Sequence, residues 1–167
     1  MPLRQPLTTC ESQQSMASTN IIIHPLLPED IPTITVIHQH CFQIPWPLES
    51  FMTLMATQTP LGFKVVSRHQ CVGFIIASVV IDEAEILTLA VDPPYQRQHW
   101  GQALLTHLIA TLQQQKATKL LLEVDENNAA ALAFYQKNEF VVTGTRKNYY
   151  HFPNRTKADA LMMQRFL

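Results

Sequence analysis

Residues 82–135 read DEAEILTLAVDPPYQRQHWGQALLTHLIATLQQQKATKLLLEVDENNAAALAFY and carry the strongest structural signals of the chain. An apolar strand ends at Val91, and the loop 92–101 follows with two prolines and a glycine. Proline ends the strand because it supplies no donor to a ladder. Apolar residues then recur at helical spacing after Trp100, which predicts an amphipathic helix. They are Leu104, Leu105, Leu108, Ile109 and Leu112.

A second strand and a second helix follow within the same stretch. Residues 119–124 are apolar at most positions, as expected for a buried strand, and a lone carboxylate, Glu123, lies near the end. Asn127 and Asn128 are favourable helix caps, because their side-chain oxygens accept N–H groups of the first turn. We therefore predict a helix over residues 129–137.

Strands and helices are also predicted on both sides of this stretch. Pro28 and the two acids after it mark the start of a helix that ends near Phe42, and a short helix follows over residues 48–56. Apolar and β-branched runs predict strands at residues 21–23, 61–67, 71–81, 85–91, 140–145 and 160–166. This order predicts an α/β fold with a mixed α+β sheet, in which a central, mostly antiparallel sheet carries helices on both faces.

The composition fits one domain of a soluble protein. The chain has 167 residues, of which 47% are hydrophobic and 15% charged, so a packed core is expected. A net charge of -1 argues against a broad nucleic-acid interface, which needs a positive excess. Residues 1–20 are rich in Gln, Ser and Thr and contain no apolar run. They predict a flexible leader and not a secretory signal.

The apolar runs and the cysteines indicate the compartment. The longest apolar run, residues 72–81, is too short to cross a bilayer. Cys10, Cys41 and Cys71 lie at wide spacings, which favours reduced thiols over a disulfide framework. We therefore expect a cytoplasmic protein, present as a monomer or weak dimer, that binds neither membrane nor nucleic acid.

One group of side chains invites a metal interpretation. His38, His40 and Cys41 are close in sequence, but only His38 and Cys41 share a face of a helix. A second pair of ligands at matching spacing does not follow. We therefore predict no metal site.

The loop before Trp100 is a candidate anion site. The first N–H groups of a helix have no intrahelical partner, and the helix dipole favours a negative charge beside them. A pyrophosphate on this turn would satisfy both, and Arg97 would add a charge-assisted hydrogen bond. An ordinary strand-to-helix connection explains the same spacing, because a short loop with one glycine is weak evidence.

The residues in and around this loop carry a family resemblance. In the loop they are Ala90, Val91, Asp92, Pro93, Gln96, Arg97, Gln98, Gly101, Leu104 and Leu105. The supporting segments are residues 82–84, 121–124, 128–131 and 146–150, together with Pro45, Trp46 and Tyr135. Together they resemble the GNAT N-acetyltransferases, and among these the ribosomal-protein-alanine N-acetyltransferases (the RimI family). The resemblance covers residues 21–166, so we expect residues 21–167 to form a GNAT domain.

The resemblance implies a reaction and a role for each matching residue. An acetyl group would move from acetyl-CoA directly to the N-terminal α-amino group of a protein, which the family implies to be a ribosomal one, without a metal. Glu123 would be the general base and Tyr135 the general acid. Backbone groups, the loop and the start of the second helix would hold the cofactor, through Leu89, Ala90, Val91, Arg97, Gln98, His99, Trp100, Gly101, Gln102 and Asn128.

These roles agree with ordinary acid–base chemistry. An α-amino group has a pKa of about 8, so a useful fraction is free amine at neutral pH. Deprotonating a lysine, with a pKa of about 10.4, costs about 3 kcal/mol more at the same pH. A carboxylate that acts through water suffices for an N-terminus. A tyrosine is protonated at neutral pH and can donate to the departing thiolate.

Other interpretations remain open for the same residues. A Glu near a strand end is usually solvated, and Tyr135 can simply fill the core. Trp46 is either a packed loop anchor or part of a peptide groove. Residues 146–150 either face the substrate, as the family segment does, or form an edge strand with a solvated outer face.

The chain departs from the family pattern at three positions. His99 stands where the family loop has glycine, which adopts positive φ at little cost, whereas histidine does so at a penalty. Trp100 is bulkier than the aliphatic residue expected there. Asp125 replaces a residue that is commonly basic and adds a negative charge near Glu123. These departures bear on cofactor affinity and on the partner, not on the fold.

Two further functions compete with the N-terminal acetyltransferase. In the first, the cofactor is the same but the acceptor is a small amine or a lysine. In the second, the domain is not catalytic and binds an acyl-CoA or a protein partner, which the histidine in the loop favours. Acetyl transfer to N-terminal peptides, compared with lysine peptides and with binding of acetyl-CoA, separates the three.

Overall fold

The computed structural model describes residues 21–57, 60–154 and 156–167; the predicted leader, residues 1–20, lies outside them. The strands are β1 (Ile22–Pro25), β2 (Leu61–Ser67), β3 (Gln70–Val80), β4 (Glu83–Val91), β5 (Lys119–Asp125), β6 (Val141–His151) and β7 (Lys157–Phe166). The helices are α1 (Ile31–Cys41), α2 (Leu48–Thr57), α3 (Trp100–Gln114) and α4 (Ala129–Lys137). Two short 3-10 turns, η1 (Pro28–Asp30) and η2 (Pro93–Tyr95), precede α1 and the loop before α3.

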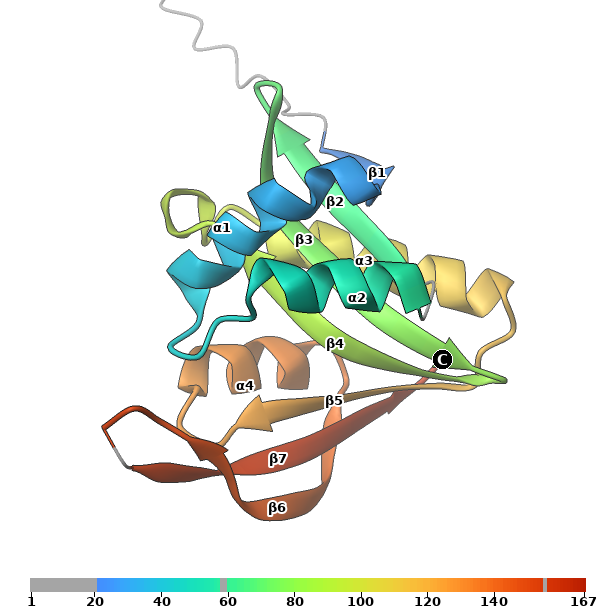
Figure 1. Cartoon of the computed structure of the whole chain (residues 1–167). Coiled ribbons are helices and arrows are strands. Elements are labelled where there is room, and N and C mark those ends of the chain that lie inside the picture. Colours follow the sequence, from blue (N-terminus) through green and yellow to red (C-terminus); the bar gives the residue numbers. More distant parts are fainter. Residues whose placement is uncertain (1–20, 58–59, 155) are drawn as a thin grey trace, which may run out of the picture.

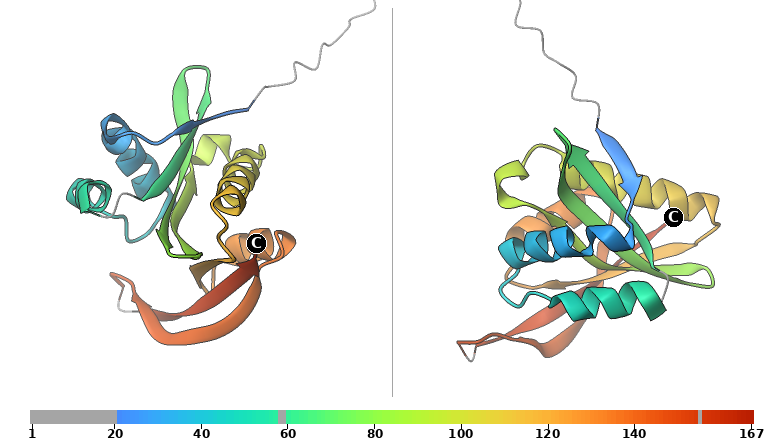
Figure 2. Two further views of the ribbon diagram at one scale, coloured as in Figure 1. Left: turned by 90° about the vertical axis from the view of Figure 1, so that its right-hand side faces the viewer. Right: turned by 45° about the horizontal axis from the view of Figure 1, so that its top comes forward.

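The strands form one seven-stranded sheet in the order β1-β2-β3-β4-β5-β7-β6. Only β4 and β5 run parallel; every other neighbouring pair is antiparallel. Helices α1 and α2 cover one face, and α3 and α4 cover the other (Figures 1 and 2). The predicted α/β architecture, with a mostly antiparallel sheet between helices, is confirmed.

Each face of the sheet buries its own apolar cluster. On the α3 and α4 face, the leucines predicted from helical spacing are fully buried, and residues of β2 to β5 and β7 pack against them. On the α1 and α2 face, Phe51 of α2 contacts Phe74 of β3 with ring centroids 6.0 Å apart. Burying one such side chain contributes about 1.5–3 kcal/mol, so the two clusters hold the helices on the sheet.

Strands β4 and β5 separate before they end. Their ladder runs from Glu83↔Lys119 to Ile86↔Leu122, but β4 continues to Val91 and β5 to Asp125. Strand β4 has a bulge next to the last of these pairs. Ile76 of β3 pairs with Thr88, whereas the following residue, Ala77, pairs with Ile86. Leu87 is therefore the extra residue. A bulge bends and twists its strand, and here it turns the second half of β4 away from β5.

The last two strands are longer than the alternation predicts. Strand β6 does not stop at residue 145 but continues to His151, and β7 begins at Lys157. Pairing along β6 is interrupted twice, once between Val142 and Gly144 and once between Arg146 and Tyr150. The residues inserted there break the period of two from which a strand is recognised. As a separate finding, no helix in the described ranges is long and apolar enough to cross a membrane.

His38 joins α1 to the segment that leads into α2. The imidazole is 2% exposed and stacks on Phe42 with ring centroids 4.1 Å apart. Its Nδ1 accepts the Trp46 backbone N–H at 3.2 Å, so the ring is neutral with its proton on Nε2. Burial lowers the pKa of His38 from 6.5 to about 4, because a charged ring is poorly solvated there.

This burial predicts a loss of stability in acid. The folded state binds the proton less readily than the unfolded state, so stability is full above pH 6.5 and falls as the pH drops toward 4. Lowering the pKa of His38 from 6.5 to about 4 corresponds to about 3 kcal/mol in the free energy of unfolding. Urea unfolding of wild type and His38→Gln at pH 4.5 and 7.5 measures it. The difference between the two proteins shrinks in acid; parallel pH profiles would contradict the assignment.

Candidate active site

The loop between β4 and α3 has the backbone that an anion site needs. Arg97 and His99 both have positive φ, 59° and 66°, and His99 is the N-cap of α3. The His99 side chain accepts no hydrogen bond from the first helical turn, so the N–H groups of that turn stay available. The family loop has glycine at this position, where a left-handed backbone is expected. The same left-handed backbone is present here, with His99 instead of glycine.

Three predicted cofactor residues use their side chains elsewhere. The Trp100 ring is buried in the core, so its bulk does not enter the loop. The Gln98 Nε2 donates to the Pro94 carbonyl at 3.2 Å. Gln102 and Asn138 exchange two hydrogen bonds of 2.7 and 3.1 Å, which tie the first turn of α3 to the end of α4. These three residues can hold a phosphate only through their backbone N–H groups.

The first turn of α3 lies over the end of β4. A Cβ placed on Gly101 would stand 3.7 Å from the Val91 side chain and 3.9 Å from that of Leu89. These are ordinary contact distances, so the structure brings Leu89, Val91 and Gly101 together, while their role in binding a cofactor stays a prediction. A molecule seated on the helix start would continue directly into the opening between β4 and β5.

The hydrogen bond from Asp92 N–H to the Val72 carbonyl, at 2.9 Å, fixes which β4 groups face β5. In an antiparallel ladder, bonded and non-bonded pairs alternate. Ala90 is therefore bonded to Phe74, and the backbone groups of Leu89 and Val91 point toward β5. The Val91 carbonyl already accepts from Gln96 Nε2 at 2.9 Å. Both groups of Leu89 and the N–H of Val91 remain for a pantetheine or an acetyl carbonyl.

Glu123 lies on the α1 and α2 face of β5. Its neighbours Leu122 and Val124 are buried on the α3 side, so the carboxylate points to the opposite face and is 17% exposed. Arg146 Nη1 stands 3.0 Å from Glu123 Oε1, and the Tyr149 hydroxyl donates a hydrogen bond to the same carboxylate. Burial, followed by the Glu123 charge, raises the pKa of Tyr149. The carboxylate is held by two residues of β6.

Tyr135 lies on the other face of the sheet. It is 8% exposed and packs edge-on against Phe140, with ring centroids 5.4 Å apart. Burial raises the pKa of the Tyr135 phenol well above its usual range, so the group stays protonated at neutral pH. The two predicted catalytic groups, Glu123 and Tyr135, therefore face opposite sides of the opening between β4 and β5. A base on one side and an acid on the other suit a transfer through that opening.

Asn128 is the N-cap of α4, as the sequence predicts. Its Oδ1 accepts the Ala131 N–H at 3.1 Å. This bond occupies the side-chain oxygen. A contact between Asn128 and a cofactor therefore depends on its Nδ2 or on its backbone.

The β6 residues around Glu123 were predicted as a segment but not as site residues. Lys147 and Asn148 form the two-residue insertion in β6, and Asn148 has a φ of 52°. Asp159 of β7 holds this insertion, since its Oδ1 accepts the Asn148 N–H at 2.8 Å and its Oδ2 pairs with Lys147. The insertion turns Tyr149 back toward Glu123. The segment is an edge strand, as one interpretation has it, and it also contacts Glu123; that it faces the substrate stays a prediction.

The end of α1 is bonded to the end of β4. His40 Nδ1 lies 2.8 Å from Asp92 Oδ1, and Cys41 Sγ donates to the Val91 carbonyl at 3.2 Å. Among the residues that the structure describes, no three His, Cys, Asp or Glu side chains are grouped to hold a metal. Trp46 packs on His38 and Phe51, with ring centroids 5.4 and 5.3 Å away, so packing explains it.

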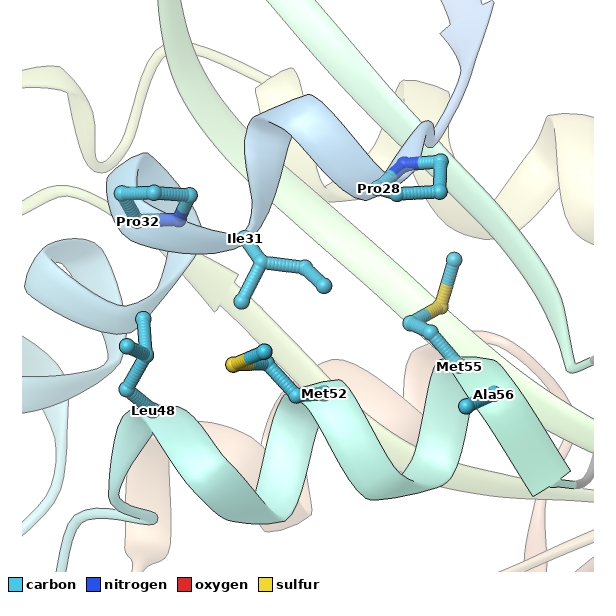
Figure 3. A pocket seen from close by; sticks show the side chains of 7 residues that line it. All are labelled: Pro28, Ile31, Pro32, Leu48, Met52, Met55 and Ala56. Carbon is cyan, nitrogen blue, oxygen red and sulfur yellow. The ribbon is translucent and has the colours of Figure 1, made fainter.

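A separate apolar groove lies between α1 and α2 (Figure 3). It has a volume of about 340 Å³ and is lined by Pro28, Ile31, Pro32, Leu48, Met52, Met55 and Ala56. None of the predicted catalytic or cofactor residues lines it. The groove is therefore distinct from the opening between β4 and β5.

Comparison with known proteins gives one consistent family. The model of the acetyltransferase (GNAT) family matches residues 31–140. The ribosomal protein bS18-alanine N-acetyltransferase of Escherichia coli (strain K12) is 37% identical over 134 residues, which cover 80% of this chain and 89% of the relative. The crystal structure of the ribosomal-protein-S18-alanine N-acetyltransferase from Escherichia coli has a TM-score of 0.82 at 36% identity, covering 87% of this chain and 93% of that one.

A more distant structure contains the expected cofactor. NAA60 of Arabidopsis thaliana, solved in complex with acetyl-CoA, has a TM-score of 0.79 and covers 88% of this chain and 98% of its own. It is 20% identical, so it supports the fold alone.

The left-handed backbone at His99 predicts the effect of restoring glycine. Because glycine adopts positive φ without steric cost, His99→Gly raises the free energy of unfolding by about 0.5–1 kcal/mol and tightens acetyl-CoA binding. Arg97→Gly relieves the same strain but removes a cation, so it stabilises the protein and weakens binding. Urea unfolding and calorimetric titration measure both variants. A less stable His99→Gly would show that the imidazole makes compensating contacts.

The β6 insertion predicts a positioning role for Asp159. Asp159→Ala releases Asn148 and lowers kcat/KM for the acceptor peptide by about tenfold, because Tyr149 and Arg146 no longer hold Glu123, while the Kd for acetyl-CoA stays within twofold. Asp159→Asn keeps the oxygen that accepts the Asn148 N–H and retains most of the activity. Lys147→Ala removes only an exposed ion pair and has little effect. Equal losses in Asp159→Ala and Lys147→Ala would assign the effect to charge.

Proposed function

The chain belongs to the acetyltransferase (GNAT) family, and we propose that it acetylates the N-terminal α-amino group of a ribosomal protein with acetyl-CoA. The observation that carries this proposal is the placement of Glu123 and Tyr135 on opposite faces of the opening between β4 and β5. The names of the relatives at 36–37% identity support the acceptor class. A ribosomal acceptor also favours a cytoplasmic location.

The groups around the opening fit the cofactor. The first turn of α3 offers backbone donors for a diphosphate, with Arg97 at the preceding loop. Leu89 and Val91 offer backbone groups in line with this turn. Acetyl-CoA supplies the thioester carbonyl that is attacked and the thiolate that leaves. The protein aligns these groups and brings the amine from the opposite face.

Glu123 removes the proton of the acceptor. An α-ammonium has a pKa of about 8, so a carboxylate acting directly or through water frees the amine at modest cost. The amine nitrogen then forms the new C–N bond as the C–S bond breaks. Arg146 and Tyr149 hold one orientation of the Glu123 carboxylate before the acceptor arrives.

Tyr135 gives a proton to the departing thiolate. A coenzyme A thiol resembles cysteine, with a pKa of about 8.5, so proton transfer from a phenol is not downhill in water. Burial raises the pKa of Tyr135, which keeps the phenol protonated at neutral pH but makes it a weaker acid. A thiolate that forms in the same apolar surroundings is desolvated as well, which raises the pKa of its conjugate thiol and brings the two groups closer in acidity. After the attack the new amide nitrogen still carries one proton too many, and it releases that proton through solvent to the Tyr135 phenolate, which restores the phenol. The proton on Glu123 returns to solvent after the product leaves.

The acceptor class is tested with two matched peptides. One carries the free N-terminus of ribosomal protein bS18; its twin is blocked at the N-terminus and carries a lysine. Initial rates with acetyl-CoA are expected to be at least about tenfold higher for the free N-terminus, since its amine is more readily deprotonated. Faster turnover of the blocked peptide would replace the proposal with lysine acetylation. Binding of acetyl-CoA without turnover of either peptide would leave a non-catalytic domain.

The two catalytic residues are tested by conservative substitutions. Glu123→Gln lowers kcat by about 100-fold or more, and Tyr135→Phe lowers it by a similar factor, because each removes one proton transfer. Asp125→Asn is the matched control, since Asp125 lies two residues further along the same face of β5 and binds Asn127. We expect it to stay within about threefold of wild type. Wild-type kcat in either catalytic variant, with an unchanged melting temperature, would remove that residue from the mechanism.

A further inference from the structure

Thr88 of β4 has a buried hydroxyl that the fold does not use. The residue is 6% exposed, and its Oγ1 finds no hydrogen-bond partner among the residues that the structure describes. A buried hydroxyl without a partner costs free energy, and valine has nearly the same shape without that cost. Packing alone therefore does not account for a threonine at this position.

The bulge in β4 places this hydroxyl on the face where Glu123 lies. Thr88 pairs with Ile76, which belongs to the cluster under α1 and α2. Residues opposite each other in a ladder share a face, so Thr88 points toward α1 and α2. Glu123 points to the same face from the neighbouring strand, one residue beyond the last β4–β5 pair. The hydroxyl and the carboxylate thus flank the opening on the side from which the acceptor comes.

We propose that the Thr88 hydroxyl holds the water molecule through which Glu123 takes the proton of the acceptor amine. This inference rests on the proposed function. The acceptor ammonium gives a proton to the water as the water gives one to Glu123, and the freed amine attacks the thioester carbonyl. Thr88 accepts or donates one hydrogen bond to the water and keeps its own proton. It is a positioning residue, since it acts on the reaction through the water and Glu123.

Several other groups on this face are charged or titratable. Among the described residues they include Glu85 and Asp92 at β4, Glu123 and Asp125 of β5, Arg146, Tyr149 and Tyr150 of β6, Cys71 of β3, and His38, His40 and Cys41 of α1. Burial raises the pKa of both thiols above their ordinary value. Helix α2 contributes only Glu49, which is exposed. Burial lowers the pKa of His38 to about 4 and raises that of Tyr150 to about 12. Because these groups are the same in Thr88→Val and Thr88→Ser, the difference between the two variants at each pH isolates the effect of the hydroxyl on the acceptor amine.

The test compares Thr88→Val with Thr88→Ser across pH. We expect Thr88→Val to lower kcat for a free N-terminal peptide by about tenfold at pH 6.5 and by less than about threefold at pH 9.5, where the amine is already deprotonated. Thr88→Ser restores most of the rate, because it restores the hydroxyl. The melting temperature of Thr88→Val stays equal or rises, and the Kd for acetyl-CoA stays within twofold. A residue with a purely structural role would not give this combination.

Thr35→Val is the matched control. Thr35 of α1 is also 6% exposed, but its hydroxyl donates to the Ile31 carbonyl at 2.8 Å. The same substitution there is expected to lower the melting temperature slightly and to leave the pH dependence of kcat unchanged.

Three outcomes would overturn the inference while the wild type remains active. They are a Thr88→Val variant within twofold of wild type at pH 6.5, a loss of the same size at every pH, and a rise in KM for the peptide with unchanged kcat. The last would mean that Thr88 touches the acceptor itself. A wild-type protein inactive on every free N-terminus refutes the proposed function and this inference with it.

Discussion

The structure depends on the point at which two parallel strands part. β4 and β5 share four paired positions and then diverge at Ile86 and Leu122, where the extra residue Leu87 bends β4. Backbone N–H and C=O groups that a continuous β4–β5 ladder would have paired therefore face the opening. The proposed catalytic and cofactor groups lie around this separation. The first turn of α3 lies over the end of β4. Tyr135 lies on the α3 and α4 face of the sheet, and Glu123 lies on the α1 and α2 face.

The regular parts of this fold could be predicted from the sequence, because their periods are undisturbed. The leucines of α3 recur at helical spacing, and residues 119–124 are too apolar to lie at the surface. Asn128 caps α4 for a reason visible in its side chain. The loop before α3 was recognised through family resemblance, since one glycine in a short loop is weak evidence by itself.

The irregular parts could not be predicted, and the residues around the proposed base, Glu123, lie there. A bulge shifts the alternation of a strand by one residue, so Thr88 cannot be assigned to a face from its sequence position. Arg146 and Tyr149 reach Glu123 because of an insertion that a carboxylate on β7 holds in place. These contacts join residues far apart in the chain, so neither the spacing of residues nor their secondary-structure propensity predicts them. The place of the bulky Trp100 ring was equally hidden, since only the fold shows that it lies in the core.

The two interruptions of β6 have a consequence for the outer edge of the sheet. Pairing with β7 is regular only at residues 141–142, 144–146 and 150–151, so no unbroken run exceeds three residues. An exposed edge strand normally offers a foreign strand a straight row of unpaired amides and carbonyls. The outer edge of β6 offers only short, kinked strand segments, and the cationic residues Arg146 and Lys147 lie among them. The same distortions that direct side chains to the Glu123 carboxylate thus leave this edge with little straight backbone on which a foreign strand could polymerise.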